Sequence, residues 1–110
     1  MDSQETHRQT RSRVTRELGS MIRRQAHKKW DGVRTAERNE GKRHVWRFRS
    51  GPDSDERFLH VPHQSMAREG AAEVLVDQLR KARWLDRLQA GPETSFVLSP
   101  AGRLQPWPRA

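Results

Sequence analysis

The chain has 110 residues, of which 32% are hydrophobic and 33% are charged, and its formal net charge is +8. It contains no cysteine, which excludes a disulfide framework, a thiolate metal site and a cysteine nucleophile. No apolar run is long enough to span a membrane and no apolar signal segment opens the chain, so we expect a small cytoplasmic protein of one domain.

The positive charge is concentrated in the first half of the chain. Residues 1–50 contain 14 Lys and Arg against 6 Asp and Glu, whereas residues 51–110 contain 8 of each kind. This asymmetry is typical of a basic surface that meets a polyanion. The 18 Arg against 4 Lys also fit the residue usage of a GC-rich genome, which is a second explanation for part of the basicity.

The N-terminal segment predicts a basic amphipathic helix. Residues 1–9 are polar and are expected to be flexible. Over residues 10–32, apolar residues recur at intervals of three and four, and Gly19 predicts a bend or a break into two pieces. The apolar positions that we consider for contact are Val14, Leu18, Met21, Ile22 and Trp30. The cations around them include Arg16, Arg23, Arg24, Lys28 and Lys29.

This helix has several interpretations. Its apolar stripe can dock on the rest of the protein and leave the arginines in solvent. The cations can instead contact phosphates, since a guanidinium pairs with phosphate oxygens in a bidentate manner. A cationic helix with an apolar side also suits an anionic membrane surface. Finally, the stripe can pair with a protein partner or with a second copy of the chain.

Two strands are predicted in the middle of the chain. Residues 33–42 read as a loop or as a strand that leads into a turn. Residues 43–49 alternate, with Trp46 and Phe48 on the same side as His44 and with the basic residues on the other side. Those outward positions are Arg43, Val45, Arg47 and Arg49. Residues 57–61 form the return strand, with Leu59 and Val61 on one side and Phe58 and His60 on the other.

Residues 71–89 form the helix on which the rest is expected to pack. A left-handed Gly91 is expected to end it, and its wide apolar surface indicates burial on two sides or a bend near Arg83. Residues 95–98 and 103–107 then predict a second hairpin. The expected fold is therefore α+β: an antiparallel sheet of two hairpins, in the order β-β-α-β-β over residues 43–110, with one central helix packed on it.

Motifs for catalysis are weak. His44, His60 and His63 make a zinc site conceivable, but a proline lies between the last two and no carboxylate stands at a diagnostic spacing. Asp53, Asp55 and Glu56 are better explained by a turn than by a cation site. No phosphate-binding loop or nucleophile elbow is present. We therefore expect no catalytic residue, no metal and no cofactor.

The leading hypothesis is a nucleic-acid-binding protein. Its predicted phosphate contacts come from the N-terminal helix and from the strand over residues 43–49; they are Arg16, Arg23, Arg24, Lys28, Lys29, Arg43, Arg47 and Arg49. If Phe58 or Trp107 opens beside the strand arginines, it offers a platform on which a base can stack. The alternative is an interaction module whose N-terminal helix docks on a partner or self-associates through Val14, Leu18, Met21, Ile22 and Trp30.

Overall fold

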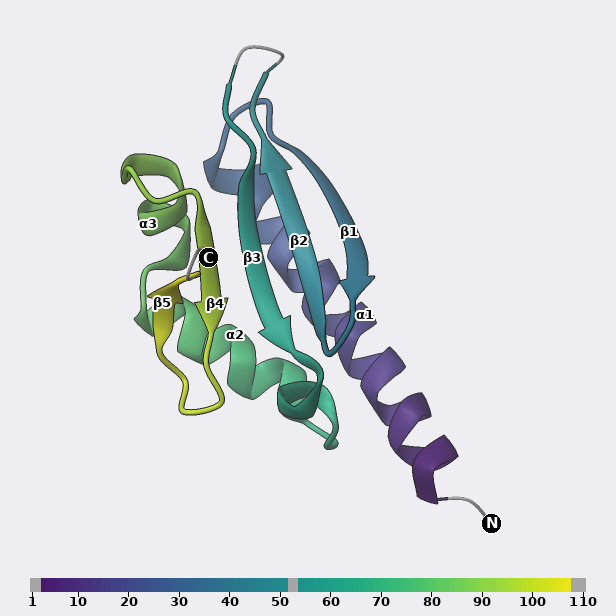
Figure 1. The fold of residues 1–110 in the computed structure, drawn as a ribbon. Coiled ribbons are helices and arrows are strands. Elements are labelled where there is room, and N and C mark those ends of the chain that lie inside the picture. The colour runs from purple at the N-terminus through teal and green to yellow at the C-terminus, as the bar shows by residue number, and fades with distance from the viewer. Residues whose placement is uncertain (1–2, 52–53, 108–110) are drawn as a thin grey trace.

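The computed structural model describes residues 3–51 and 54–107, which form three α-helices, one short 3-10 helix and five strands (Figure 1). Residues 1 and 2 of the predicted flexible segment, and Asp53 of the acidic turn, lie outside these ranges. The elements in chain order are α1 (Ser3–Lys29), β1 (Arg34–Glu40), β2 (Arg43–Arg49), β3 (Arg57–Pro62), η1 (His63–Met66), α2 (Ala71–Lys81), α3 (Trp84–Ala90), β4 (Ser95–Leu98) and β5 (Leu104–Pro106).

The five strands form one mixed sheet in the order β1-β2-β3-β4-β5. Three of the four pairings are antiparallel, and β3 pairs with β4 in parallel. The α+β class is confirmed, but the purely antiparallel sheet of two hairpins is wrong in two respects. Residues 34–40 add a fifth strand, and the connection through α2 and α3 returns the chain to the starting end of β3, which makes β4 parallel to it.

The N-terminal helix is longer than the sequence predicts. It begins at Ser3 and runs without interruption to Lys29. Gly19 does not split it, and the residue lies where α1 packs against β2. A Cβ at Gly19 would stand 3.2 Å from the indole Nε1 of Trp46 and 3.1 Å from Nη1 of Arg23. A Cβ at this position would therefore press on Arg23 and on the buried indole, so glycine suits the close packing of helix and sheet.

The helix predicted over residues 71–89 consists of two helices. Arg83 has a left-handed backbone (φ 54°), which ends α2 and redirects the chain into α3. The change of direction brings Trp84 and Leu88 into the core, although both lie off the apolar stripe of a continuous helix. The expected bend near Arg83 is thus confirmed. The left-handed Gly91 is wrong, because Gly91 is extended with φ −93° and α3 ends at Ala90.

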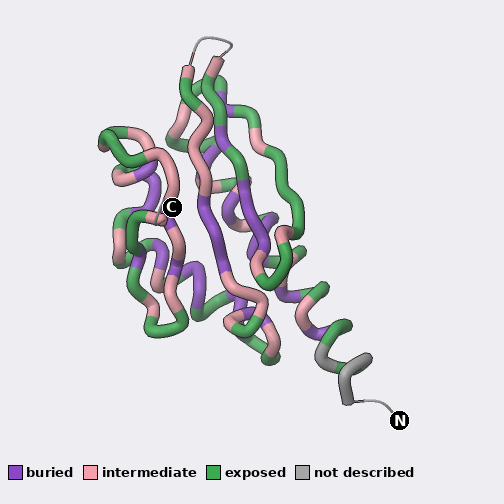
Figure 2. The backbone as a smooth tube through the Cα atoms, viewed as in Figure 1, coloured by how far each residue is buried: buried purple, intermediate pink, exposed green. Residues whose placement is uncertain are grey.

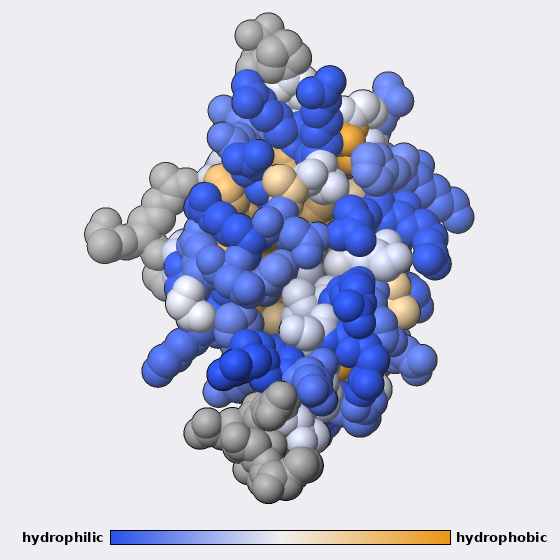
Figure 3. Space-filling model, turned by 90° about the vertical axis from the view of Figure 1, so that its right-hand side faces the viewer, coloured by the Kyte–Doolittle hydropathy of each residue, from blue (hydrophilic) through white to orange (hydrophobic). Residues whose placement is uncertain are grey.

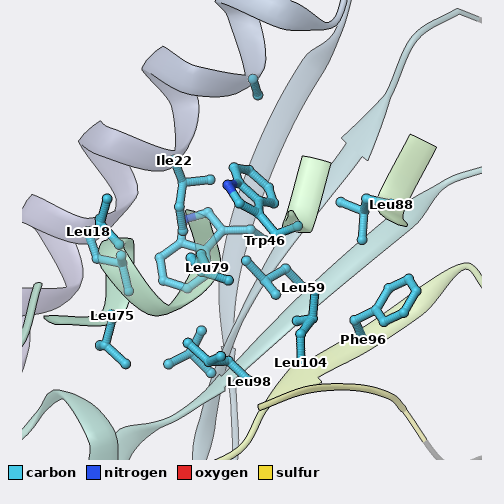
Figure 4. Packing of buried hydrophobic residues seen from close by; sticks show 14 of the residues in the cluster. Leu18, Ile22, Trp46, Leu59, Leu75, Leu79, Leu88, Phe96, Leu98 and Leu104 are labelled. Atoms are coloured by element: carbon cyan, nitrogen blue, oxygen red, sulfur yellow. The ribbon is translucent and has the colours of Figure 1, made fainter. Parts of the chain in front are cut away.

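All three α-helices cover the same face of the sheet, and the core lies between these two layers (Figures 1 and 4). Trp46 and Phe48 of β2 and Leu59 and Val61 of β3 point into it, as the predicted alternation requires. Val45 and His60 point to the other side of the sheet but are also buried. Figure 2 shows this buried strip along the two central strands. We call the opposite face of the sheet, which none of the helices in residues 3–51 and 54–107 covers, the open face.

The side of the molecule that carries the edge strand is mostly hydrophilic, with small hydrophobic patches (Figure 3). None of the β1 residues is buried, because this strand stands at the edge of the sheet. Charged side chains on such an edge discourage pairing with another chain. Within residues 3–51 and 54–107, no helix is both long and apolar enough to cross a membrane.

Candidate nucleic-acid interface

The predicted phosphate contacts fall on two opposite sides of the molecule. The residues from α1 lie on the helical layer, because the buried side of α1 packs on the core face of the sheet. Arg43, Arg47 and Arg49 alternate with the buried Trp46 and Phe48 along β2, so they project from the open face. The structure therefore does not bring the two sets together into one surface.

On α1, four of the five predicted cations are exposed: Arg16, Arg24, Lys28 and Lys29. The fifth, Arg23, is half-buried and its Nη1 lies 2.5 Å from Oε2 of Glu37 on β1. Arg13, which the sequence does not single out, pairs with Glu69 just before α2. The helix thus presents a cationic outer side, part of which is tied to carboxylates of the same chain.

The apolar stripe of α1 belongs to the protein's own core. Val14, Leu18 and Ile22 are each at most 1% exposed, and Met21 and Trp30 pack against the same cluster. Figure 4 shows Leu18 and Ile22 of α1 in this core. The ring of Trp30 stacks on Phe48 with 5.9 Å between centroids. A partner that used this stripe would first have to separate α1 from the sheet.

The open face carries five arginines from two neighbouring strands. Because β1 is a strand, Arg34 and Arg38 project from the same face as Arg43, Arg47 and Arg49, and Arg34 lies directly opposite Arg49 in the β1–β2 ladder. Sequence reasoning missed these two because residues 33–42 read equally as a loop or as a strand. The alternation in RTAERNE identifies them once a strand is assumed.

Arg57 does not belong to this face, although its strand pairs with β2. It lies opposite Phe48 in the ladder and therefore points to the helical side. Its Nη1 donates hydrogen bonds of 2.9 Å to the backbone oxygens of Gly91 and Glu93. This contact closes the loop between α3 and β4 and gives Arg57 a structural role.

Two carboxylates of the described residues pair with the arginines of the open face. Oε1 of Glu40 lies 3.2 Å from Nη2 of Arg43, and its Oε2 accepts a hydrogen bond of 2.6 Å from Nε of Arg38. Oε2 of Glu56 lies 3.1 Å from Nε of Arg47. Glu40 and Glu56 thus pair with Arg38, Arg43 and Arg47. These pairs are partly solvated, so a phosphate can compete for the guanidinium groups.

Three of the arginines line one hollow of about 590 Å³, which we call the arginine hollow. Arg34, Arg47 and Arg49 surround it together with Gly32, Thr35, Ala36, Ser50 and Gly51. None of the described residues that line it is acidic. Nε of Arg49 donates to the backbone oxygen of Gly51 at 2.9 Å, which holds this guanidinium at the end of β2. The arrangement suits an anion with several oxygens.

A second hollow of about 330 Å³, the Phe58 hollow, adjoins the first, and both are lined by Ala36 and Arg47. Its apolar lining consists of Ala36, Val45 and the half-buried Phe58. Arg38, Arg47 and Glu56 place charged groups around it. An aromatic ring beside cations is the combination that single-strand binders use.

At the other end of the same face, Trp107 lies flat on His60. The rings are 4.3 Å apart and inclined by only 10°, and the guanidinium carbon of Arg43 is 4.3 Å from the indole centroid. Nε of Arg43 donates to Nδ1 of His60 at 3.1 Å, so guanidinium and imidazole lie side by side against the indole. We call Trp107, His60 and Arg43 the Trp107 stack.

The environment of His60 favours its neutral form. Burial, and then the positive charge of Arg43, lower the pKa of His60 from 6.5 to about 4. The neutral ring can accept the hydrogen bond from Arg43, whereas a protonated ring cannot. The stack is therefore intact at neutral pH. Local sequence gives little signal for it, because Trp107 reaches His60 across β4.

His44 and His63 lie on the helical side of the sheet. Nε2 of His44 is 3.1 Å from Oε1 of Glu37, and its Nδ1 is 2.9 Å from Oδ1 of Asn39, which also contacts His63. The sheet separates this pair from His60, so the three histidines do not meet. Over residues 3–51 and 54–107, no group of three or more His, Cys, Asp or Glu side chains is arranged to hold a metal ion.

Comparisons of the chain with protein-family models, with curated proteins and with solved structures found no match. Its function has to be inferred from the geometry and chemistry of its own residues.

Proposed function

We propose that the protein binds nucleic acid, with the open face of the sheet as the principal surface. The observation that carries this proposal is the arginine hollow, in which Arg34, Arg47 and Arg49 from two strands surround one space. Guanidinium groups match phosphate oxygens in charge and in geometry, and each neutralised phosphate releases condensed counterions. Arg38 and Arg43 extend the positive charge along the same face.

The cations of α1 form a second, separate part of the proposal. Arg16, Arg24, Lys28 and Lys29 lie on the helical layer, and a strand bound in the arginine hollow cannot reach them without passing around the sheet edge. They can attract a polyanion over a distance of about 10 Å at moderate salt. The two surfaces are therefore tested with separate variants, each of which removes the same number of positive charges.

The test is fluorescence anisotropy with labelled oligonucleotides over a range of salt concentrations. In the sheet variant, Arg34, Arg47 and Arg49 are changed to Gln. The matched helix variant changes Arg16, Arg24 and Lys28 to Gln, which removes the same charge from the opposite side. We expect the sheet variant to bind more weakly and to reduce the slope of log affinity against log salt by about 2–3, at roughly 0.7–0.9 for each phosphate that is no longer neutralised.

The helix variant should bind only slightly more weakly and keep most of the slope. A wild-type protein that binds no oligonucleotide at low salt would refute nucleic-acid binding altogether. If the helix variant shows the larger reduction in the salt slope, α1 rather than the open face is the principal binding surface.

A further inference from the structure

The open face combines its arginines with two aromatic side chains at neighbouring positions. Phe58 and His60 are two residues apart on β3 and point to the same side, so the Phe58 hollow and the Trp107 stack are about 7 Å apart along the strand. From this arrangement we infer that the ligand is single-stranded and that unpaired bases stack on Phe58 and on Trp107. The inference rests on the proposed function and specifies the ligand of the same surface.

The residues that line the Phe58 hollow suit the binding of a nucleic-acid base. The exposed Ala36 and the half-buried Phe58 offer apolar surface for a flat ring, while Val45 beneath them is only 2% exposed. Arg38 and Arg47 stand beside this surface. It shares Ala36 and Arg47 with the arginine hollow. A base on Phe58 therefore leaves its own phosphate within reach of the arginines of that hollow. A paired base would be stacked inside a duplex and could not enter.

Trp107 is held in position for the same task. One face of its indole lies against His60 and Arg43, and its backbone N–H donates to the backbone oxygen of Ser95 at 2.8 Å. The ring is therefore fixed before a ligand arrives, which reduces the entropy cost of binding. Trp107 is half-buried, and we propose that a base stacks on the side of its indole away from His60.

Duplex recognition needs none of these features. A protein that contacts only phosphates has no use for aromatic rings on its binding surface, and a double helix hides the faces of its bases. Stacking on aromatic side chains tolerates any sequence, because every base has a π-face. We therefore expect affinity without strong sequence preference.

The experiment compares four ligands of about ten nucleotides, a length within the range of known single-strand sites. They are a single strand of DNA, the RNA strand of the same sequence, the DNA duplex, and a DNA strand without bases. The proteins are wild type, Phe58→Ala, Trp107→Ala, and Val74→Ala as the control. Val74 is an exposed apolar residue on α2, 56% exposed, away from the open face. Phe58→Leu serves as a milder variant that keeps the apolar lining but removes the ring.

We expect wild type to bind the single strands more tightly than the duplex and the strand without bases. Phe58→Ala and Trp107→Ala should each weaken single-strand binding by roughly 5- to 150-fold, the effect of one stacked base. The salt slope should not change, because both variants keep every arginine that meets a phosphate, and Val74→Ala should bind as wild type. A difference between the DNA and RNA arms supports the same site and shows which sugar it prefers.

Two results would overturn the inference while leaving the proposed function standing. One is a duplex or baseless strand that binds wild type as tightly as the single strand. The other is unchanged single-strand affinity in Phe58→Ala, Phe58→Leu and Trp107→Ala. If wild type bound none of the four ligands at low salt, the proposed function itself would fail.

Discussion

His60 shows how one residue links the open face to the stability of the fold. Its ring lies under Trp107, the residue is only 6% exposed, and its Nδ1 accepts a hydrogen bond from Arg43. A protonated His60 would face the positive charge of Arg43 with too few contacts to water. Burial and this charge therefore keep the folded-state pKa near 4, below the ordinary value of 6.5.

The depressed pKa predicts a loss of stability in acid. Above about pH 6.5 the imidazole of His60 is neutral in both the folded and the unfolded chain, so its stabilising contribution to folding is fully present. As pH falls from 6.5 towards 4, His60 binds a proton in the unfolded chain but not in the folded chain, so the free energy of unfolding falls. Urea unfolding of wild type should show that His60 lowers the free energy of unfolding by about 2–3 kcal/mol between pH 7 and pH 4.

Gln is the matched replacement, because its side-chain oxygen can still accept from Arg43 and does not titrate. His60→Gln should lose less stability than wild type over the same pH range. All other titratable groups are the same in both proteins, so the difference between the two isolates His60. Equal pH dependence would contradict the assigned pKa.

At the level of secondary-structure elements, Gly19 shows how the packing of α1 on the sheet accounts for a residue that helix propensity disfavours. Helix propensity alone predicts that a glycine in the middle of α1 is unfavourable by about 1 kcal/mol against Ala. The structure places α1 close to β2, so a Cβ there would stand 3.1 Å from Nη1 of Arg23 and 3.2 Å from Nε1 of Trp46. That nitrogen is buried and has no hydrogen-bond partner among the described residues. A larger side chain at position 19 would have to move the helix or the indole.

Gly19→Leu should therefore destabilise the protein, by about 1–3 kcal/mol as for other overpacked cores. Ser20→Leu is the matched control, because Ser20 is the next residue and is exposed. It should change stability by no more than about 0.5 kcal/mol. Thermal or urea unfolding of both variants measures this. A Gly19→Leu protein as stable as wild type would show that α1 does not pack on Trp46 as described.

Local patterns in the chain predict the elements better than their arrangement. The alternation of Trp46 and Phe48 with arginines is a property of adjacent residues, and it places β2 and its basic side correctly. The parallel pairing of β3 with β4 depends on how α2 and α3 return the chain, which no local pattern records. Likewise, the position of Trp84 indicates a bend at Arg83, but the left-handed backbone there is imposed by tertiary packing.

For the whole molecule, the central result is that the basic half of the chain is divided between two sides. The sheet lies between them: α1 presents Arg16, Arg24 and Lys28 on one side, while the strands present their arginines on the other. The sequence predicts the excess charge but not its division, because a helix docked on one face of a sheet cannot be distinguished from a free one by its periodicity alone. On the open face, the arginines of two strands line two adjoining hollows, one of which contains an aromatic ring.

The binding surface can be located most directly by an NMR titration of the ¹⁵N-labelled protein with a single-stranded oligonucleotide at low salt. If the open face binds the strand, the largest amide shifts should lie in β1, β2 and β3, at Arg34, Ala36, Arg47 and Phe58. The outer side of α1, represented by Arg16, Ser20 and Arg24, should change little. Shifts concentrated on α1, or no shifts at all, would contradict the assignment of the open face as the binding surface.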